Sequence, residues 1–573
     1  MDFGISKFRR LLFVSCIGLA STNLIDLTDT MIAGNLLGET ALSAMNLFWP
    51  CVDFQFFVCM AIASGTAILY SRAAGAFDAD RASKIFSNGL VLAVLTGAGL
   101  GLGYWLLRGP AEVFYGVSGK MGALLTAYWN VFVFEVLIFP AYVFLNTMVA
   151  SDGDTTVGTV SFLVELLVNA VASYFLCKAY GIAGCAMGSI VSTLAGLAVT
   201  SIHFFKDTNS FVFQWYFSLK DSLGAFCADL PEASVSLFSA VVYAVMNKVL
   251  IVDFGESALP VMTAVVATNG FALFLYGVPP AAQPIVGVYR VEGNFGAVRR
   301  VMRSALGTSL LLGCMVGTFF ALFPSLPVRL IGIVSPEVSA QACQAVRIVA
   351  FSYPFVAVTA LFTAYYLYIE RIGLSLALVA LQSAVLPLSF SAAGAVAWGE
   401  SGFWFGYMVA TPFAVLVFFL VLKAFMRDRL EAPPWFLDLT RNVYASTWTL
   451  RTEPTEICRV AEEVQKRLEH VNAPAATLAK AAFMVEDMLM QIRSRNQERA
   501  VLAEVLLDVY PDNKDKTFAR IILRDDGVVD EKAAVKASAD DAFRGEMLDA
   551  VMEKLKGRQS RVTTGFNRQE FLL

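Results

Sequence analysis

Long apolar segments recur along the chain up to about residue 426, and short polar stretches separate them. Each segment is roughly 20 residues or longer, the length that an α-helix needs to cross the hydrocarbon layer of a bilayer. The pattern therefore predicts an all-α membrane protein. Its twelve expected transmembrane helices cover residues 9–34, 44–70, 85–107, 122–150, 156–178, 182–205, 223–252, 258–289, 299–324, 338–368, 372–397 and 400–426.

The composition supports a membrane protein. Hydrophobic residues make up 57% of the chain and charged residues only 16%, whereas a soluble domain has about 25% charged residues. An intrinsically disordered chain has the opposite composition and is excluded. The first apolar run follows a positively charged start, as in a signal peptide, but it is too long and has no clean cleavage site. We interpret it as an uncleaved first span.

The charges at the span ends predict the orientation. With twelve spans and a cytoplasmic N-terminus, most Lys and Arg residues near the span ends fall on the cytoplasmic side, and only Arg108, Lys120, Lys178 and Arg329 fall on the other. Positive charge marks cytoplasmic loops. We therefore expect a multi-pass protein of the cytoplasmic membrane with both termini in the cytoplasm.

The composition changes after residue 430. The stretch "EAPPWF" (431–436) is a proline break, and residues 440–573 are rich in charge and in helix-forming residues. Two short runs, "EVLLDVY" (504–510) and "ARIILRDDG" (519–527), resemble strands. This part predicts a small soluble α/β domain of ordinary size.

Cysteine and histidine spacing predicts no metal site. The nine cysteines form no CxxC or Cys/His pattern, and the two histidines, His203 and His470, are far apart in sequence. A disulfide framework is not indicated either. No catalytic nucleophile–base pair is evident in the apolar part, so we expect no enzyme there.

The apolar part contains an internal repeat. "LGETALSAM" (37–45) returns as "FGESALPVM" (254–262), and "GIAGCAMGSIVST" (181–193) returns as "GESGFWFGYMVAT" (399–411), at offsets of 217 and 218 residues. The copies are six spans apart, so both halves have the same orientation. Such repeats are typical of secondary transporters, although an old duplication in a membrane scaffold would leave the same pattern. We expect an N-terminal lobe (1–215), a C-terminal lobe (216–430) and the soluble domain (431–573).

Four motifs of the apolar part are distinctive: "DTMIAGNLLGETALSAMN" (29–46), "ASDGDTTVG" (150–158), "YGIAGCAMGSIVSTL" (180–194) and "AAQPIVGVYRVEGNFGAVRRVMR" (281–303). They resemble motifs of the multidrug and toxic compound extrusion (MATE) transporters. The resemblance implies two six-helix lobes and export of organic cations, driven by entry of protons or sodium ions.

Two aspartates lie in the first apolar segment. Ionisable residues within spans are rare and are functional by default. Asp29 occupies the first-helix aspartate position of the family, which implies a cation- or proton-coupling carboxylate. Asp26 lies three residues earlier, on much of the same helical face. An alternative for Asp26 is a place beside a helix break or a water-filled rim.

The fifth span carries a further polar face. Glu165, Asn169 and Ser173 are spaced by four residues and share one side of a helix. Asn169 matches an asparagine of the family motif, whereas Ser173 stands where the family has an aspartate. Glu165 could supply the missing carboxylate to the same cavity, unless it lies at a helix end. Glu165→Gln should then abolish coupled export.

Other polar residues within spans are weaker candidates for the coupling-ion or substrate site. Asp53 follows a proline early in the second span, and Glu135 lies in the fourth. Gln283 belongs to the eighth span and is as suited to joining helices as to touching substrate. Asn247 and Lys248 stand near the second-half position that corresponds to Asp29, so that half carries no matching acid.

The soluble domain resembles a degenerate histidine-kinase-type ATPase of the anti-sigma kind. In that resemblance Glu486 matches the acid of the first box, Gln491 replaces its magnesium-binding asparagine, and Asp525 and Gly527 match the D-x-G motif. A glycine-rich lid is not visible in residues 531–555, although cradling phosphate needs exposed backbone N–H groups. We expect weak or absent ATP hydrolysis, and a sensing role or a cytoplasmic protein partner.

These observations lead to one main functional hypothesis. The chain is expected to export small organic cations as a secondary antiporter, with a proton or sodium ion as coupling ion and no required cofactor. A flippase for lipid-linked or glycan substrates and a membrane receptor that signals through residues 431–573 remain alternatives. No basic patch with interleaved aromatic residues indicates nucleic-acid binding.

Overall fold

A computed structural model describes residues 2–572 apart from short gaps and two longer ones. The undescribed residues within that range are 23, 76–77, 153, 207–208, 370, 426–444, 471–472, 498, 510–518, 528–556 and 564–565. The chain divides into two compact units. Unit 1 comprises Met1–Leu12, Pro280–Ala305 and Asp428–Leu573, and unit 2 comprises Phe13–Pro279 and Leu306–Arg427. The lobe boundaries expected from the sequence stay a prediction.

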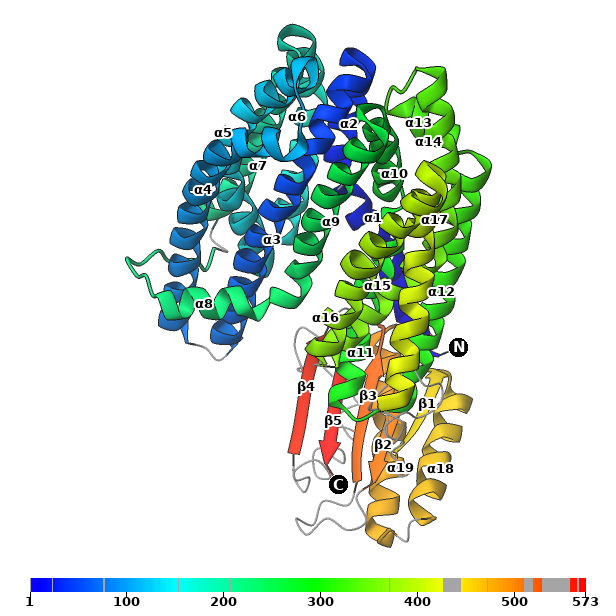
Figure 1. Ribbon diagram of the computed structural model, residues 1–573. Helices are drawn as coiled ribbons and strands as arrows, with labels where there is room; N and C mark the ends of the chain where they lie inside the picture. The colour runs from blue at the N-terminus through cyan, green and yellow to red at the C-terminus, as the bar shows by residue number, and fades with distance from the viewer. Residues whose placement is uncertain are drawn as a thin grey trace. The chain divides into compact units, whose positions relative to one another are not determined.

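Helices account for almost all of the described chain before residue 426 (Figure 1). Up to the middle of the chain they are α1 (Phe3–Thr22), α2 (Leu24–Leu37), α3 (Glu39–Gly75), α4 (Ala79–Tyr115), α5 (Gly119–Ser151), α6 (Thr155–Tyr180), α7 (Ile182–Ser201), η1 (Ile202–Phe205), α8 (Leu219–Ala228) and α9 (Leu230–Phe254). After them come η2 (Glu256–Ala258), α10 (Leu259–Phe271), η3 (Leu273–Gly277), α11 (Val278–Val291), α12 (Phe295–Leu322), α13 (Ser325–Leu330), α14 (Pro336–Val349), η4 (Ala350–Ser352), α15 (Tyr353–Tyr368), α16 (Ile372–Ala380), η5 (Leu381–Val385) and α17 (Leu386–Phe425).

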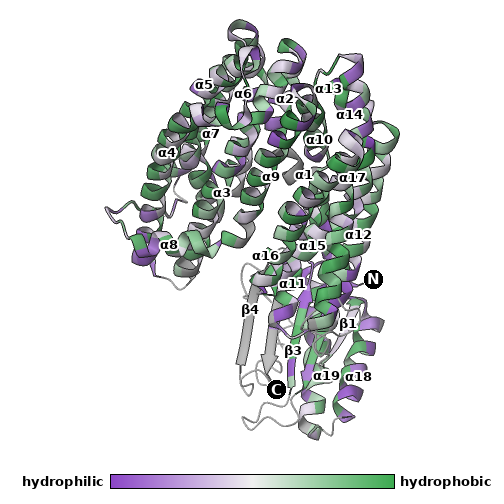
Figure 2. Ribbon diagram, in the orientation of Figure 1, coloured by the Kyte–Doolittle hydropathy of each residue, from purple (hydrophilic) through white to green (hydrophobic). Residues whose placement is uncertain are grey.

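Among the described residues, nine helices are long and apolar enough to cross a membrane, or ten if one bent pair counts as a span. Figure 2 shows hydrophobic residues along α4 and α17 in particular. The stretch Ile372–Ala424 counts as one of the nine, but Trp398 and Gly399 have non-helical backbone angles within α17. This kink lies where the sequence predicts the end of span 372–397 and the start of span 400–426. The chain is thus a multi-pass membrane protein, and the predicted number of twelve spans is supported in part.

The glycines of the internal repeat make equivalent contacts in both halves. Gly181 and Gly399 have φ angles of 64° and 65°, a backbone conformation that side chains disfavour. A methyl group at Gly188 would lie 2.1 Å from Ser173 Oγ and 2.6 Å from Ser173 Cα. At Gly406 it would lie 2.1 Å from the carbonyl oxygen of Phe390. These glycines therefore allow close helix packing, as the sequence predicts.

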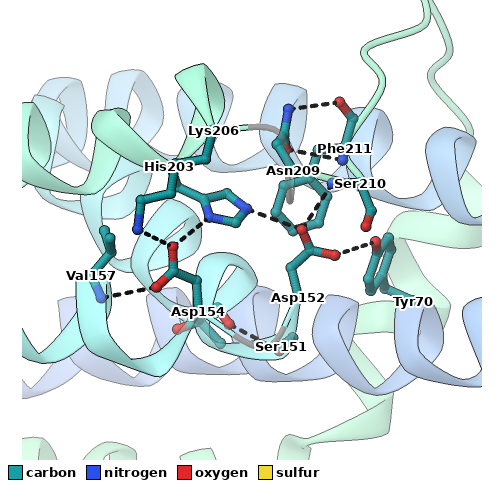
Figure 3. A network of polar contacts seen from close by, with 11 residues as sticks. Tyr70, Ser151, Asp152, Asp154, Val157, His203, Lys206, Asn209, Ser210 and Phe211 are labelled. Atoms are coloured by element: carbon teal, nitrogen blue, oxygen red, sulfur yellow. Dashed lines mark hydrogen bonds and ion pairs between the residues drawn. The ribbon is translucent and has the colours of Figure 1, made fainter.

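A fully buried histidine joins the turn between α5 and α6 to the end of α7 (Figure 3). The Nδ1 atom of His203 lies 3.0 Å from Asp154 Oδ2, and its Nε2 atom lies 3.0 Å from Asp152 Oδ2. Lys206 donates to the same Asp154 oxygen at 2.7 Å. Asp152 also accepts from the backbone N–H of Ser210 at 2.9 Å. The network thereby fixes the start of the segment that leads to α8.

The side chain of Asp154 gives this network a pH dependence. Hydrogen bonds from Lys206 and then His203 hold the pKa of the Asp154 carboxyl well below its usual range. A carboxyl with a lowered native pKa stabilises the fold above its ordinary pKa and loses that contribution as the pH falls. We expect Asp154→Asn to lower the melting temperature at pH 7, and the difference from wild type to shrink below about pH 4. Thermal unfolding in detergent between pH 7 and pH 3 measures this, and a difference that grows towards acid pH would contradict it.

The soluble part of unit 1 is a five-stranded antiparallel sheet with two helices, α18 (Pro454–Glu469) and α19 (Ala475–Arg495). Residues of both helices and of the first three strands form one hydrophobic core. The two runs predicted as strands form β2 and β3. The spatial strand order is β1-β2-β3-β5-β4, with β1 (Ala445–Arg451), β2 (Leu502–Val509), β3 (Ala519–Asp525), β4 (Gly557–Thr563) and β5 (Phe566–Leu572).

The amphipathic pattern of α18 shows why this domain folds. Its buried residues recur at helical spacing and face the core, while polar residues cover the other side, as Figure 2 shows. Two segments discussed from the sequence lie outside the described residues: the proline break (431–436) and residues 531–555, where a glycine-rich lid would be expected.

Candidate functional site

The candidate site is a cavity of about 550 Å³ within unit 2. Four carboxylate side chains line it, and no Lys, Arg or His does among the described residues. The rest of its wall is largely aromatic and aliphatic. The polar and aromatic lining residues are Asp26, Asp29, Phe48, Trp49, Gln55, Phe56, Tyr128, Phe132, Glu135, Phe139, Tyr142, Asn146, Thr147, Ser151, Phe162, Glu165, Ser189, Ser192 and Thr193.

Helix α2 carries Asp29 into this cavity, where the side chain is only 7% exposed. Its Oδ2 atom accepts hydrogen bonds from Ser189 Oγ at 2.9 Å and from Asn169 Nδ2 at 3.2 Å. Its Oδ1 atom has no hydrogen-bond partner. Residues of α6 and α7 thus fix one oxygen of the carboxylate, and the other is buried without a hydrogen-bond partner.

Asp26 lies one turn earlier, in the first turn of α2. Residue 23, between α1 and α2, lies outside the described residues, so the alternative of a helix break beside Asp26 stays a prediction. The side chain lines both the main cavity and a second, smaller one.

Two glutamates reach the cavity from other helices. Glu165 of α6 accepts a hydrogen bond from Tyr142 Oη at 2.7 Å, and Glu135 of α5 accepts one from Gln55 Nε2 at 3.1 Å. Glu165 lies well inside α6, so the alternative of a helix-end position is wrong. The structure thus brings Glu135 and Glu165 together with the two aspartates.

The remaining polar residues of α6 lie behind the cavity. Asn169 and Ser173 are both fully buried, and Asn169 reaches the site through its bond to Asp29. Ser173 packs against the backbone of α7 at Gly188. No aspartate would fit at this contact without a shift of α7, which gives a steric reason for the departure from the family motif.

A second cavity of about 250 Å³ contains Asp53. Its polar wall also includes Asp26, Asn46 and Asn269. Gln283, on α11, is exposed and lines neither cavity. Asp53 therefore lies in the second cavity, which it shares with Asp26, and not on the wall of the main one.

Three neutral residues of the main site were not identified from the sequence: Gln55, Tyr142 and Ser189. Each donates a hydrogen bond to one of the acids. Tyr142 is in turn linked to Asn146 at 3.2 Å and to Ser161 at 3.3 Å. Neutral polar side chains also join helices within a membrane, so the residue types alone do not indicate a site.

In the soluble domain, Asp525 is one of the residues that the sequence suggests for nucleotide binding. Both carboxylate oxygens of Asp525 accept from Arg495 Nη2, at 3.0 and 2.8 Å. Its Oδ1 atom also accepts from the backbone N–H of Gly527. The Asp525 carboxylate is therefore already paired.

Helix α19 carries the first-box motif, and its two neighbouring acids differ in exposure. Glu486 is exposed, whereas its neighbour Asp487 is buried and accepts from Gln491 Nε2 at 2.9 Å. A nucleotide site in this domain stays a prediction.

Comparisons with known proteins identify the fold. The MatE family model matches residues 15–175, and no curated protein matches the chain. An inward-facing multidrug resistance MATE family transporter of the MOP superfamily is similar, with a TM-score of 0.61 and 17% identity over 72% of this chain and 99% of its own. An outward-facing transporter of that family gives a TM-score of 0.60 and 19% identity over 74% and 97%.

A third similar structure is a MOP superfamily transporter from Pyrococcus furiosus, with a TM-score of 0.57 and 19% identity over 73% of this chain and 95% of its own. It is described by the words "reverse polarity of binding pocket suggests different function". These likenesses show a MATE transporter fold, as the sequence resemblance predicts. All three proteins are transporters, which agrees with the expectation that the chain is not an enzyme.

Proposed function

We propose that the chain is a MATE-family secondary antiporter that exports organic cations across the cytoplasmic membrane. Entry of protons or sodium ions drives export, and the binding site is exposed alternately to the two sides of the membrane. One observation carries the proposal: four carboxylates converge on one aromatic cavity whose described wall contains no basic side chain. Carboxylates attract cations, and aromatic faces bind them further through cation–π contacts.

The fold and its relatives support this proposal. The family model covers the segment that contains Asp26, Asp29, Glu135 and Glu165, and similar structures exist in inward- and outward-facing conformations. Transporters with repeated halves place their substrate sites within the membrane and change access by moving parts of the bundle.

Pocket charge argues against the flippase alternative. A site for phosphate-linked substrates needs basic groups, since Arg and Lys are the usual phosphate ligands. Lys248, the basic residue that the sequence left open, lines neither cavity. Its Nζ atom lies 5.8 Å from the ring centre of Phe114. Pocket polarity is also the property that the description of the Pyrococcus furiosus relative connects with a different function.

The proposal is tested by efflux of a cationic dye from proteoliposomes that contain the purified full chain. A proton gradient and a sodium gradient are imposed separately. We expect one gradient to accelerate dye movement over protein-free liposomes, and dissipation of that gradient to stop it. Absence of gradient-dependent movement under both conditions would refute an antiporter.

Deletion of residues 431–573 separates transport from the receptor alternative. We expect the truncated chain to keep at least about half of the efflux rate, because all four cavity carboxylates belong to unit 2. Size-exclusion chromatography controls for folding of the truncated chain. Loss of efflux from a folded truncation product would show that the soluble domain is required.

A further inference from the structure

The segment that leads from α7 to α8 has apolar side chains on its exposed side. Its described residues 209–218 form neither helix nor strand. From residue 213 onward, exposed and half-buried side chains alternate. The exposed ones are Phe213, Trp215, Phe217 and Leu219, and the half-buried ones between them are Gln214, Tyr216 and Ser218. This is the reverse of a strand on a soluble protein, where polar residues face outward.

Backbone hydrogen bonds to α4 fix this orientation. The N–H of Gln214 donates to Ser87 Oγ at 2.8 Å, and the N–H of Ser218 donates to Asn88 Oδ1 at 2.7 Å. Both acceptors are buried. The exposed fraction nevertheless reaches 93% at Trp215. Specific contacts therefore hold the large apolar side chains outward.

The two ends of the segment are also attached to the helices. At the start, beside the His203 network (Figure 3), Phe211 is buried and stacks on Phe86 with ring centres 4.4 Å apart. At the end, Asp221 of α8 accepts hydrogen bonds from both Nη atoms of Arg81, at 3.0 and 2.7 Å. The exposed apolar face is thus held at both ends.

The connections of the segment place it at a membrane surface. It joins two helical stretches that are long and apolar enough to cross a membrane, Ile182–Phe205 and Ala233–Phe254. Asp80 accepts from Gln214 Nε2 at 3.5 Å and forms an ion pair with Lys84. Asp80 is exposed, and an exposed charge is costly in hydrocarbon. The segment therefore belongs at the level of the lipid headgroups.

We infer that residues 213–219 form an interfacial membrane anchor. The side chains of Phe213, Trp215, Phe217 and Leu219 insert at the boundary between the headgroups and the acyl chains of the surrounding bilayer. Exposed apolar patches mark contacts with membranes or proteins, and attachment between two spans favours the membrane. Aromatic residues, Trp above all, are enriched at this boundary. The anchor is independent of the proposed transport function.

The fluorescence of Trp215 tests its depth. Wild type and Trp215→Phe are reconstituted as full chains in phosphatidylcholine vesicles, with bromine either near the headgroup end of the acyl chains or near their middle. The difference between the two proteins reports Trp215 alone. We expect the shallow bromine to quench this difference signal about twofold more strongly than the deep one, because interfacial segments insert about 5–10 Å.

Trp448→Phe is the matched control for Trp215→Phe. Trp448 lies in β1 and packs against the core of the soluble domain. Its difference signal should be quenched by neither lipid. Both variants keep the nine native cysteines, and Trp215 is so exposed that its replacement removes little packing.

Spin labels on single cysteines test the alternation. Trp215→Cys, Phe217→Cys, Gln214→Cys and Tyr216→Cys are made in a full chain without its native cysteines, and Glu462→Cys, at an exposed position of α18, is the water-facing control. Oxygen concentrates in lipid and a nickel chelate in water. We expect the oxygen/nickel collision ratio at 215 and 217 to exceed that at 462 about threefold, and oxygen collisions at 214 and 216 to be lower than at 215 and 217.

Each contrary outcome overturns the anchor in a different way. A Trp215 that neither lipid quenches, with a collision ratio at 215 equal to that at 462, shows a segment in water. Labels at 215 and 217 that neither reagent reaches show a face covered by protein. Stronger quenching by the deep bromine places Trp215 in the hydrocarbon. If the cysteine-free chain does not fold, the fluorescence measurement decides. Neither measurement uses dye efflux, so failure of the anchor and failure of the antiporter are separate results.

Discussion

Replacement of Asp29 by Asn is expected to lower gradient-driven dye efflux at least tenfold, equivalent to about 1.4 kcal/mol of lost coupling. The side chain is almost completely buried and faces the cavity with one unpartnered oxygen. Asparagine has nearly the same size but carries no charge and takes up no proton. Competition between cation and coupling ion for one carboxylate would therefore be lost.

The hydrogen bonds around Asp29 sharpen this expectation. Ser189 and Asn169 both donate to Oδ2, and an asparagine can still accept from them through its own oxygen. The variant should consequently fold, with a melting temperature close to that of wild type. Loss of transport without loss of stability is the expected pattern.

Asp253→Asn is the matched control for Asp29→Asn. Asp253 lies near the end of α9, is exposed and lines neither cavity. The two variants change the net charge equally, and initial efflux rates are compared under the same proton or sodium gradient. An Asp29→Asn protein that transports within about twofold of wild type would show that the coupling carboxylate is elsewhere.

The sequence predicted the acids of the site better than their neutral partners. An ionisable residue in an apolar span is costly, so Asp29 and Glu165 stand out from their surroundings. The four-residue spacing of Glu165 and Asn169 correctly indicated one helical face. Gln55 and Ser189 come from α3 and α7, and their roles arise only when four helices pack together.

The second cavity could not be predicted from the sequence, for a similar reason. The sequence shows only that Asp53 follows a proline early in the second predicted span, whereas its surroundings depend on residues from the second half. Tyr243, Asn269 and Tyr276 line the same small cavity. No local pattern specifies which side chains of α9 and α10 approach α3.

The division of the chain into these two compact units was also not predicted from the sequence. Unit 1 joins Pro280–Ala305 and the first residues to the soluble domain, although hydropathy assigns part of Pro280–Ala305 to apolar spans. Hydropathy measures composition along the chain, whereas grouping depends on contacts between distant segments. The sequence nevertheless revealed the internal repeat, because its glycines are required for backbone packing in each half.

Helix packing at these repeat glycines leads to the second prediction with a large effect. Gly188→Ala should lower the free energy of unfolding by about 1–3 kcal/mol, the cost of overpacking a close contact, and so lower the melting temperature. The added methyl would lie only 2.6 Å from Ser173 Cα. Backbone cannot rotate away as a side-chain tip can, so α7 must move away from α6.

This movement should also reduce transport. Ser189 follows Gly188 on α7, Asn169 precedes Ser173 on α6, and both donate to Asp29. Separation of the two helices would break at least one of these bonds. Gly188→Ala is therefore expected to lose stability and efflux together, unlike Asp29→Asn, which should lose efflux alone.

The second half supplies the corresponding test. At Gly406 a methyl would lie 2.1 Å from the carbonyl oxygen of Phe390, so Gly406→Ala should destabilise the protein to a similar degree. Gly103→Ala and Gly373→Ala are the controls, since a methyl at either helical position meets no atom within 4 Å. These controls should melt at or slightly above the wild-type temperature, as alanine favours a helix over glycine by up to about 1 kcal/mol. If Gly188→Ala and Gly406→Ala melt like these controls, the repeated glycines are not required for packing, and the structural equivalence of the two halves at this contact fails.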